Sequence, residues 1–452
     1  PLFEIINSSG MRELSHAILC LPLLFKLAFT FKIGSTVWNY HNGVLSNGAL
    51  TSSLRPDTKL NFSSKLKTSH LELKMSNEAV AVIGGGISGL TCARELSKLG
   101  ISAVVFDTGK KEVGGRCSTR KFRNDGRELV FDHSAQFIAV SDDSSPVFKE
   151  LVAEMESAGV ITPWDSSVVG TLQAGGRFQA SSAGSGTVYY KAPGGMGEVP
   201  KFLAEQCQVE RPVWVSKIRR NRNNNSWGAW HYKEFVGNYG HVVISHNGKC
   251  AARLMSSAGK ECDLLYKQLN ARFGATVKYD TPRFMQLNSL WVLCAHFDQD
   301  IQTPAKFEGA FVKGIRDLSW VSNNSAKLES TGSGSSWTII SSPTFGQKFK
   351  CPQENIPPEH ADMVTEKLLS AFAVAAGLPQ GSLEPSFSFV QLWGAANPIS
   401  VSDVPSNTPF IYQNDVRVGI CGDWLMSPSI ESAVCSGYAL AHHIGAVMNE
   451  SI

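Results

Sequence analysis

Apolar residues between positions 79 and 106 follow two different periods, which predict a strand, a helix and a second strand. Residues 79–84 include no charged or strongly polar position, as expected of a parallel strand that is buried on both faces. Residues 101–106 form a second such run, and they follow Gly100, a residue type that often ends a helix. Between the two runs, apolar side chains recur on one helical face at Leu90, Ala93, Leu96 and Leu99.

Beyond this unit the pattern predicts more strands than helices. Helical spacing covers 147–158, 199–206 and 359–376, and a last helix begins near Ile430. Short alternating segments between Ser166 and Tyr190 suggest one or two hairpins. The strand pattern at 241–245 is expected to return to the sheet of the first unit, and further strand patterns cover 289–297, 310–312, 318–322, 336–342 and 386–392. We therefore expect a second sheet, mixed or antiparallel.

The turn after the first strand has the sequence GGGISG, which matches GxGxxG. In such a turn Gly84 allows the tight bend, Gly86 lets the backbone approach a pyrophosphate, and Gly89 lets the helix lie close to the strand. Ile87 and Ser88 open the helix, whose N–H groups and positive dipole end point toward phosphates. A GxGxxG alone is weak evidence, but strand, turn and helix in register predict a dinucleotide site.

Two further features lie where a dinucleotide would need them. Asp107 ends the second strand, and its carboxylate can accept both hydroxyl hydrogens of an adenosine ribose. Gly114 and Gly115 precede Arg116, which suits a second backbone approach to the pyrophosphate with a cation beside it. The alternative is a Gly-Gly turn followed by a surface arginine.

Together these stretches resemble the flavin amine oxidase superfamily, most closely the renalase-like FAD-dependent oxidoreductases. The resemblance is carried by the GxGxxG turn, Asp107, GGRCSTR from Gly114 and FDHSAQF from Phe131. It implies FAD as the cofactor. The segment VERPVWVSKI looks like the family's adenine-contacting segment, in which the backbone of Val213 would pair with adenine.

The segment VGICGD, followed by SIESAVCSG, is similar to the family's closing FAD motif. There Gly422 clears room for the cofactor chain, and Asp423 can accept from a ribityl hydroxyl. The N-terminus of the following helix would stabilise the anion that forms on the flavin pyrimidine edge. By position, the helix residues expected near the cofactor are Ile430, Glu431 and Ser432.

The fold implied by the resemblance is α/β, with a discontinuous Rossmann-like FAD-binding domain and an inserted substrate domain built on a mixed or antiparallel β-sheet. We expect the FAD-binding domain in residues 75–140, 191–255 and 406–452. The substrate domain is expected in residues 141–190 and 256–405.

Composition adds little beyond the first 74 residues. That stretch is basic and rich in Ser, Thr, Asn and Lys, which predicts an organelle-targeting segment, with the chloroplast favoured over the mitochondrion. A secretory signal and a retained, disordered N-terminus are the alternatives. The remainder is near neutral, so nothing predicts nucleic-acid binding. No transmembrane segment is expected, because the apolar stretch 17–25 is shorter than the ~20 residues of a span.

The chain has 10 cysteines but no CxxC, so we expect reduced thiols and neither a metal site nor a disulfide framework. The resemblance implies hydride transfer from a small-molecule substrate to flavin N5. Reoxidation is by oxygen or another acceptor, and NAD(P)H and a quinone are candidate redox partners.

The candidates for the wall of the flavin ring are Gln136, Phe137 and Trp393. The family often has a basic residue just before the tryptophan, where this chain has Gln391 and Leu392, so the substrates of relatives do not transfer. Amine oxidases of the family also use a lysine near flavin N5, and residues 290–297 contain none. The alternative is a flavin-binding assembly or regulatory protein without turnover.

Overall fold

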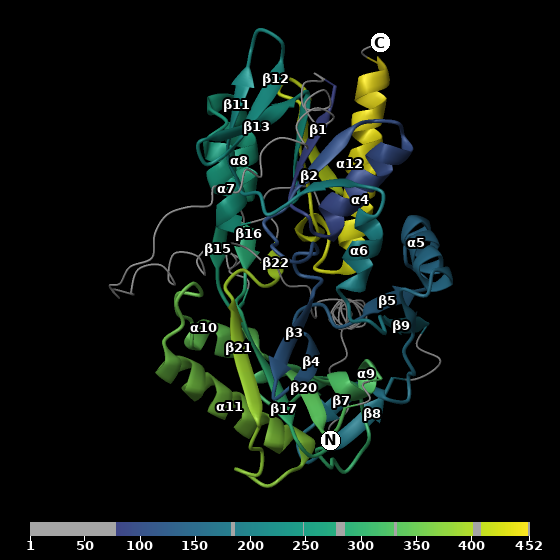
Figure 1. The fold of residues 1–452 in the computed structure, drawn as a ribbon, viewed down its shortest axis with the longest axis vertical. Helices are drawn as coiled ribbons and strands as arrows, with labels where there is room; N and C mark the ends of the chain where they lie inside the picture. The colour runs from purple at the N-terminus through teal and green to yellow at the C-terminus, as the bar shows by residue number, and fades with distance from the viewer. Residues whose placement is uncertain are drawn as a thin grey trace, which may run out of the picture.

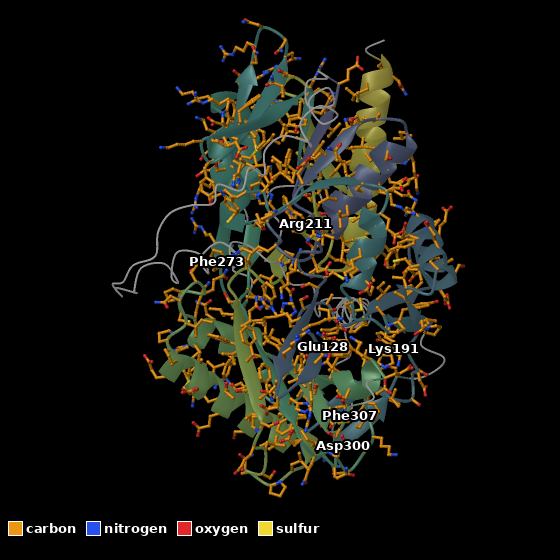
Figure 2. All side chains as sticks on the ribbon, viewed as in Figure 1. Glu128, Lys191, Arg211, Phe273, Asp300 and Phe307 are labelled. Carbon is orange, nitrogen blue, oxygen red and sulfur yellow. The ribbon has the colours of Figure 1, made fainter. Side chains whose placement is uncertain are left out.

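The computed structural model describes residues 78–181, 186–246, 248–276, 285–329, 332–400 and 408–450. The predicted targeting segment, residues 1–74, lies outside them. The chain forms two bodies, one above the other in Figure 1, and we name them by their main sheets. It crosses between them repeatedly, because Glu128 and Asp300 lie in the lower, seven-stranded body and Arg211 lies in the upper, six-stranded body (Figure 2).

The six-stranded sheet has five parallel strands and one antiparallel edge strand, β23. Its members come from far-separated parts of the chain, as the discontinuous domain predicted. In spatial order they are β10 (Gln208–Glu210), β2 (Ala103–Phe106), β1 (Val80–Ile83), β14 (His241–Ile244), β24 (Val418–Cys421) and β23 (Phe410–Gln413).

The sheet is covered on both faces, which explains why β1 and β2 have no polar positions. In β1, Val80 and Val82 face a layer of helices, whereas Ala81 and Ile83 face a three-stranded meander and two further helices. The helical layer contains α4 (Ile87–Lys98), α5 (Pro146–Ser157), α6 (Glu198–Ala204) and α12 (Ile430–Glu450). The opposite layer contains β11 (Val215–Asn221), β12 (Ser226–His231), β13 (Glu234–Tyr239), α7 (Gly248–Ser256) and α8 (Asp263–Leu269).

Two glycines set the close packing around α4. A Cβ on Gly89 would lie 2.1 Å from the carbonyl oxygen of Gly84, so only glycine lets α4 approach β1 this closely. A Cβ on Gly437 of α12 would lie 2.2 Å from the carbonyl oxygen of Ser88. The first helix of the described chain and the last one are therefore in backbone contact.

The seven-stranded sheet is mixed, as expected, because β18 pairs parallel with β7 and the other pairs are antiparallel. In spatial order its strands are β21 (Phe387–Trp393), β17 (Leu290–Phe297), β20 (Ser335–Ser341), β19 (Leu318–Asn323), β18 (Gly309–Lys313), β7 (Val169–Gln173) and β8 (Arg177–Ala180). One face packs on α11 (Pro358–Ala376) and α10 (Pro343–Lys348). The other packs on the hairpin of β3 (Thr119–Asn124) and β4 (Arg127–Asp132), beside α9 (Asn324–Lys327).

The division into domains differs from the expected one in three places. Helix α5, expected in the substrate domain, buries Phe148 and Met155 in the six-stranded body. Residues 263–273 and 285–287 also pack there, through side chains such as Leu265. In the opposite direction, the β3–β4 hairpin buries Phe131 on the seven-stranded sheet. Apolar periodicity predicted these elements but not which body each one covers.

Two small sheets complete the described fold. One joins β5 (Ile138–Ser141), β9 (Thr187–Lys191) and β6 (Thr162–Pro163), and the other joins β15 (Ala271–Phe273), β16 (Met285–Leu287) and β22 (Pro398–Ser400). Within the described ranges, no helix combines the length and apolar character needed to cross a bilayer.

Candidate dinucleotide-binding cleft

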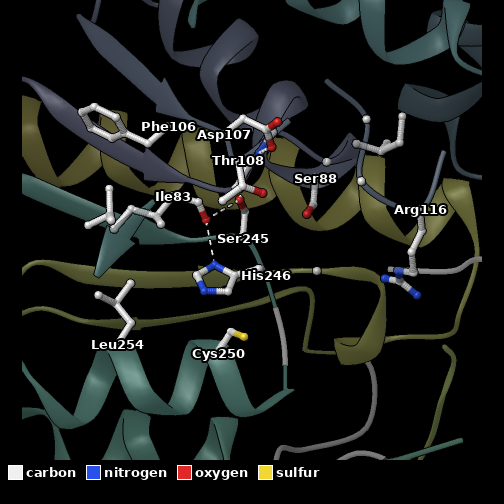
Figure 3. A pocket seen from close by; sticks show the side chains of 18 of the residues that line it. Ile83, Ser88, Phe106, Asp107, Thr108, Arg116, Ser245, His246, Cys250 and Leu254 are labelled. Carbon is white, nitrogen blue, oxygen red and sulfur yellow. Dashed lines mark hydrogen bonds between the residues drawn. The ribbon is translucent and has the colours of Figure 1, made fainter. Parts of the chain in front are cut away.

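A cleft opens at the carboxyl ends of β1, β2 and β24 in the six-stranded body (Figure 3). This edge of a parallel sheet is where nucleotides bind in doubly wound folds. Its lining comes from residues 83–88, 106–108, 114–117, 213–216, 245–246, 250, 253–254, 422–424 and 433. It therefore gathers residues from the glycine-rich turn, Asp107 and the segments GGRCSTR, VERPVWVSKI, VGICGD and SIESAVCSG, but none from FDHSAQF.

The glycine-rich turn forms the centre of the cleft, and Gly84, Gly86, Ile87 and Ser88 line it. Gly86 has an ordinary backbone conformation, with φ −83°, and a Cβ built on it would meet no protein atom within 4 Å. Nothing in the protein therefore requires glycine at this position. Gly89 differs, because it packs α4 on the sheet and does not line the cleft.

Asp107 lines the cleft next to this turn. Its Oδ2 accepts a hydrogen bond from the N–H of Gly85 at 2.9 Å, and its Oδ1 accepts one from Gly109 at 2.7 Å. Burial raises the pKa of Asp107, against the lowering effect of these N–H groups and of Arg211. The carboxylate is thus held in one orientation at the end of β2.

One end of the cleft is apolar, with Ile83, Phe106 and Leu254 (Figure 3). Val213 also lines the cleft, but its N–H already donates to the carbonyl of Asp107 at 2.7 Å. Only its carbonyl is therefore open to pair with a base.

Ser245 and His246 also line the cleft, and the sequence motifs did not identify them as site residues. The Ser245 hydroxyl donates to the Gly84 carbonyl at 2.7 Å, and His246 Nδ1 lies 3.0 Å from the carbonyl of Ile83. Their signal was their position directly after the strand predicted to return to this sheet.

At the other end, Arg116 and Asp423 form an ion pair (Figure 3 labels Arg116). Arg116 also donates to the carbonyl of Ala396 at 3.3 Å. Asp423 is 1% exposed, and within the described residues its Oδ2 has no hydrogen-bond partner. Gly114, Gly115 and Gly422 line the cleft beside them. This end therefore has a fixed cation and a buried acceptor with one oxygen still unbonded.

The first turn of α12 reaches the cleft only through Ala433. Ile430 is buried in the helical layer. Glu431 accepts from the N–H of Ser145 at 2.8 Å and from the Ser144 hydroxyl at 3.0 Å. Glu431 therefore joins α12 to the start of α5. Ser432 exchanges hydrogen bonds with Ser427 and Ser429.

Gln136 is fully buried and lies outside the cleft lining. Its amide nitrogen donates to the carbonyls of Asp132 and Ser134 at 2.6 and 2.8 Å. Its amide oxygen accepts from the Trp320 indole and the Ser322 hydroxyl at 3.3 and 2.8 Å. Because a glutamine amide can make four hydrogen bonds, this one has no capacity left for a ligand.

The other two candidates for the ring wall also lie outside the lining. Phe137 packs against Tyr189, Phe311 and Trp320 in the seven-stranded body. Trp393 is buried, and its indole N–H donates to the carbonyl of His133 at 3.2 Å. Both segments continue to the cleft at Arg116, whose guanidinium donates to the Ala396 carbonyl and whose own carbonyl accepts from the N–H of Ala135.

A buried lysine, Lys327, was not found from the sequence. Its ammonium donates to Asp132 Oδ2 at 2.6 Å and to the Gln136 carbonyl at 2.5 Å, and both members of the ion pair are 0% exposed. Asp132 Oδ1 accepts from the Thr119 hydroxyl and from the N–H of Met196. Strand β17 has no lysine, as the sequence indicated.

Comparisons with known proteins agree with this architecture. A family model described as an NAD(P)-binding Rossmann-like domain matches residues 82–155. Cyclohexylamine oxidase from Brevibacterium oxydans is similar with a TM-score of 0.57 and 12% identity, over 82% of this chain and 99% of that one. Putrescine oxidase bound to putrescine gives 0.55 and 12%, over 82% and 99%. A proposed protoporphyrinogen oxidase from Exiguobacterium gives 0.56 and 11%, over 82% and 99%.

These likenesses show the fold, and they confirm the predicted fold class. The chain has a dinucleotide-binding Rossmann-like domain combined with further sheets, in the arrangement of the flavin amine oxidases. In the described part of the chain, no group of three or more His, Cys, Asp and Glu side chains could hold a metal ion.

Proposed function

We propose that this protein is an FAD-dependent oxidoreductase that acts on a small organic molecule. The observation that carries the proposal is the order of groups along one cleft. An apolar end is followed by Asp107, by the N-terminus of α4 and then by Arg116 with Asp423 (Figure 3). That order matches adenine, ribose, pyrophosphate and ribityl chain in FAD.

Two features of the cleft test the fit of this group. The space beside Gly86 is open, so a pyrophosphate could approach the backbone there. A larger side chain at this position would occupy that space. Asp423 Oδ2 is a buried acceptor without a partner in the described structure, and a ribityl hydroxyl would satisfy it. FAD is favoured over a nicotinamide dinucleotide because the latter has no need of Arg116 and Asp423 at the far end.

When bound, the isoalloxazine ring supplies the hydride-accepting chemistry. The protein's own groups do the rest. The N–H groups at the start of α4 and the Arg116 guanidinium offset the charge of the phosphates. Asp107 and Asp423 would hold the two hydroxylated parts of the cofactor and so orient it along the cleft.

The substrates that appear in the names of the similar proteins are not assigned to this protein. We do not propose oxidation of a simple amine, because the amine oxidases that the sequence resembles use a lysine near flavin N5. Strand β17 has no lysine, and Lys327 already donates to Asp132 and to the Gln136 carbonyl. Renalase-like activity, and oxygen, NAD(P)H or a quinone as the redox partner, stay predictions of the sequence.

The test is the cofactor itself. Protein that begins near Met75 is expected to purify yellow and to release FAD, and not FMN, on denaturation, because Asp107 and the apolar end serve an adenosine that FMN lacks. Protein that is colourless and stays colourless after incubation with FAD would overturn the proposal.

A further inference from the structure

Two buried polar side chains near Trp393 have no hydrogen-bond partner in the described structure. Gln391 is 4% exposed, and in the described structure neither atom of its amide has a hydrogen-bond partner. His133 is 2% exposed, and neither of its ring nitrogens has one. The backbone of Ser118 lies close enough to the His133 ring to raise its pKa, against the larger lowering effect of burial. Each such group costs stability, roughly 1–3 kcal/mol, and calls for an explanation.

The fold places both side chains in one region. Residues in β21 alternate between the two faces of the sheet, so Gln391 shares a face with Trp393 and Phe389, which pack in the core on that side. The His133 ring lies 5.4 Å from the Trp393 ring. Gln391 and His133 therefore approach the same tryptophan.

This region adjoins the Arg116 end of the cleft. Two residues after His133, the N–H of Ala135 donates to the Arg116 carbonyl at 3.0 Å. Three residues after Trp393, the carbonyl of Ala396 accepts from the Arg116 guanidinium. A molecule held by His133 and Gln391 would consequently lie next to the redox end of the proposed cofactor.

One guanidinium lies close to this region. The Arg120 guanidinium lies 5.3 Å from the centre of the Phe389 ring, and its charge reaches both His133 and Cys294. Burial lowers the pKa of His133, and Arg120 lowers it further, so the ring is neutral at pH 7 and offers one N–H donor. The nearby carboxylate, Asp132, is already neutralised by Lys327.

We propose that His133 and Gln391 bind the carboxylate of a small organic acid, with Arg120 supplying the positive field, and that this acid is the substrate. The amide and imidazole N–H groups are donors that an anionic oxygen would satisfy. An ammonium group could donate to the Gln391 amide oxygen or the bare imidazole nitrogen, but the Arg120 guanidinium would repel it. The role of substrate rests on the proposed oxidoreductase function, whereas binding of the acid does not.

The test uses benzoate and benzylamine, two probes of similar shape and opposite charge. Isothermal titration calorimetry is performed on the purified protein, with its FAD content measured in the same sample. Benzoate is expected to bind at millimolar or lower concentration and benzylamine is not. No binding of benzoate, or equal binding of both probes, would overturn the proposal.

Variants assign the binding to the two side chains. Gln391→Met and His133→Leu should each weaken benzoate by about 10- to 150-fold, because a hydrogen bond to a charged group is lost. The control is Ser388→Ala, an exposed position of the same strand, which should change nothing. Unchanged affinity in both variants would contradict the assignment.

A stability measurement separates this role from a structural one. Since the Gln391 amide has no partner in the described fold, Gln391→Met should leave the melting temperature unchanged or raise it by about 1–4 °C. A fall of several degrees would show that the amide supports the fold, and would count against the proposal. Benzoate binding by protein that does not bind FAD would leave this inference standing while the proposed function fails.

Discussion

Two buried carboxylates, each beside a cation, occupy different regions of the molecule and are satisfied to different degrees. Between the two bodies, Asp132 accepts from Lys327, Thr119 and Met196, and both of its oxygens are bonded. In the cleft, Asp423 pairs with Arg116 through one oxygen only. Burial does not distinguish them, since Asp132 is 0% exposed and Asp423 is 1% exposed.

In these two ion pairs, the unmet hydrogen bond, rather than the buried charge, distinguishes the carboxylate that is assigned to binding. A completely bonded buried pair holds the folded chain together, and removing one partner leaves the other charge uncompensated. A buried carboxylate with one unbonded oxygen lowers the stability of the fold, and a ligand that donates a hydrogen bond to that oxygen can remove this cost. The four predictions below test this contrast.

The largest effect is expected at the fully bonded pair. Lys327→Met leaves the Asp132 carboxylate buried without its counter-charge and should lower the free energy of unfolding by about 3–5 kcal/mol, measured by urea denaturation. Adding Asp132→Asn to the same chain should recover part of this loss. An unchanged denaturation midpoint for Lys327→Met would show that the Lys327–Asp132 pair does not stabilise the folded chain.

The second effect is expected in the cleft and concerns the cofactor. Asp423→Ala should weaken FAD by about 1.5–3 kcal/mol, or roughly 10- to 150-fold, because a charge-assisted hydrogen bond to the ribityl chain is lost. The free energy of unfolding of the FAD-free protein should fall by less than in Lys327→Met, because Arg116 is 12% exposed and keeps its hydrogen bond to the Ala396 carbonyl. Full FAD occupancy in Asp423→Ala would show that this carboxylate does not hold the cofactor.

The glycines allow the same contrast without charge. Gly89→Ala places a Cβ 2.1 Å from a backbone oxygen and should cost about 1–3 kcal/mol of stability. Gly86→Ala meets no protein atom, so it should change stability by about 0.5 kcal/mol or less and weaken FAD instead. Thermal melting with and without FAD measures both quantities, and equal melting temperatures of the two FAD-free variants would contradict the assignment.

The smallest effect is expected at a third carboxylate, Glu431, which lies close to the cleft but has both oxygens bonded to the start of α5. Glu431→Gln keeps the shape and removes the charge, so stability should fall by about 0.5–1.5 kcal/mol with FAD affinity unchanged. A loss of FAD with normal stability would place Glu431 in the site after all. Equilibrium dialysis of FAD beside urea denaturation decides between them.

The sequence predicted what depends on neighbouring residues. The motifs singled out the turn at Gly84–Gly86, Asp107 and Asp423, because glycine conformation and strand ends are local properties, and these residues line one cleft. The pairing of Lys327 with Asp132 joins residues 195 positions apart, and no periodicity reports it. The motif FDHSAQF likewise did not show that its Gln136 makes four hydrogen bonds within the protein, because its partners depend on the tertiary fold.

The discontinuous sheet has a consequence for biosynthesis. Strand β24, Asp423 and helix α12 come from the last stretch of the described chain, yet α12 packs along α4 near its beginning. A ribosome-bound chain can form β1, α4 and β2 early, but it cannot close the cleft until residues 418–450 have left the exit tunnel. Such long-range closure is the slow step of folding. Tight retention of a dinucleotide therefore reports that translation of the whole described chain is complete.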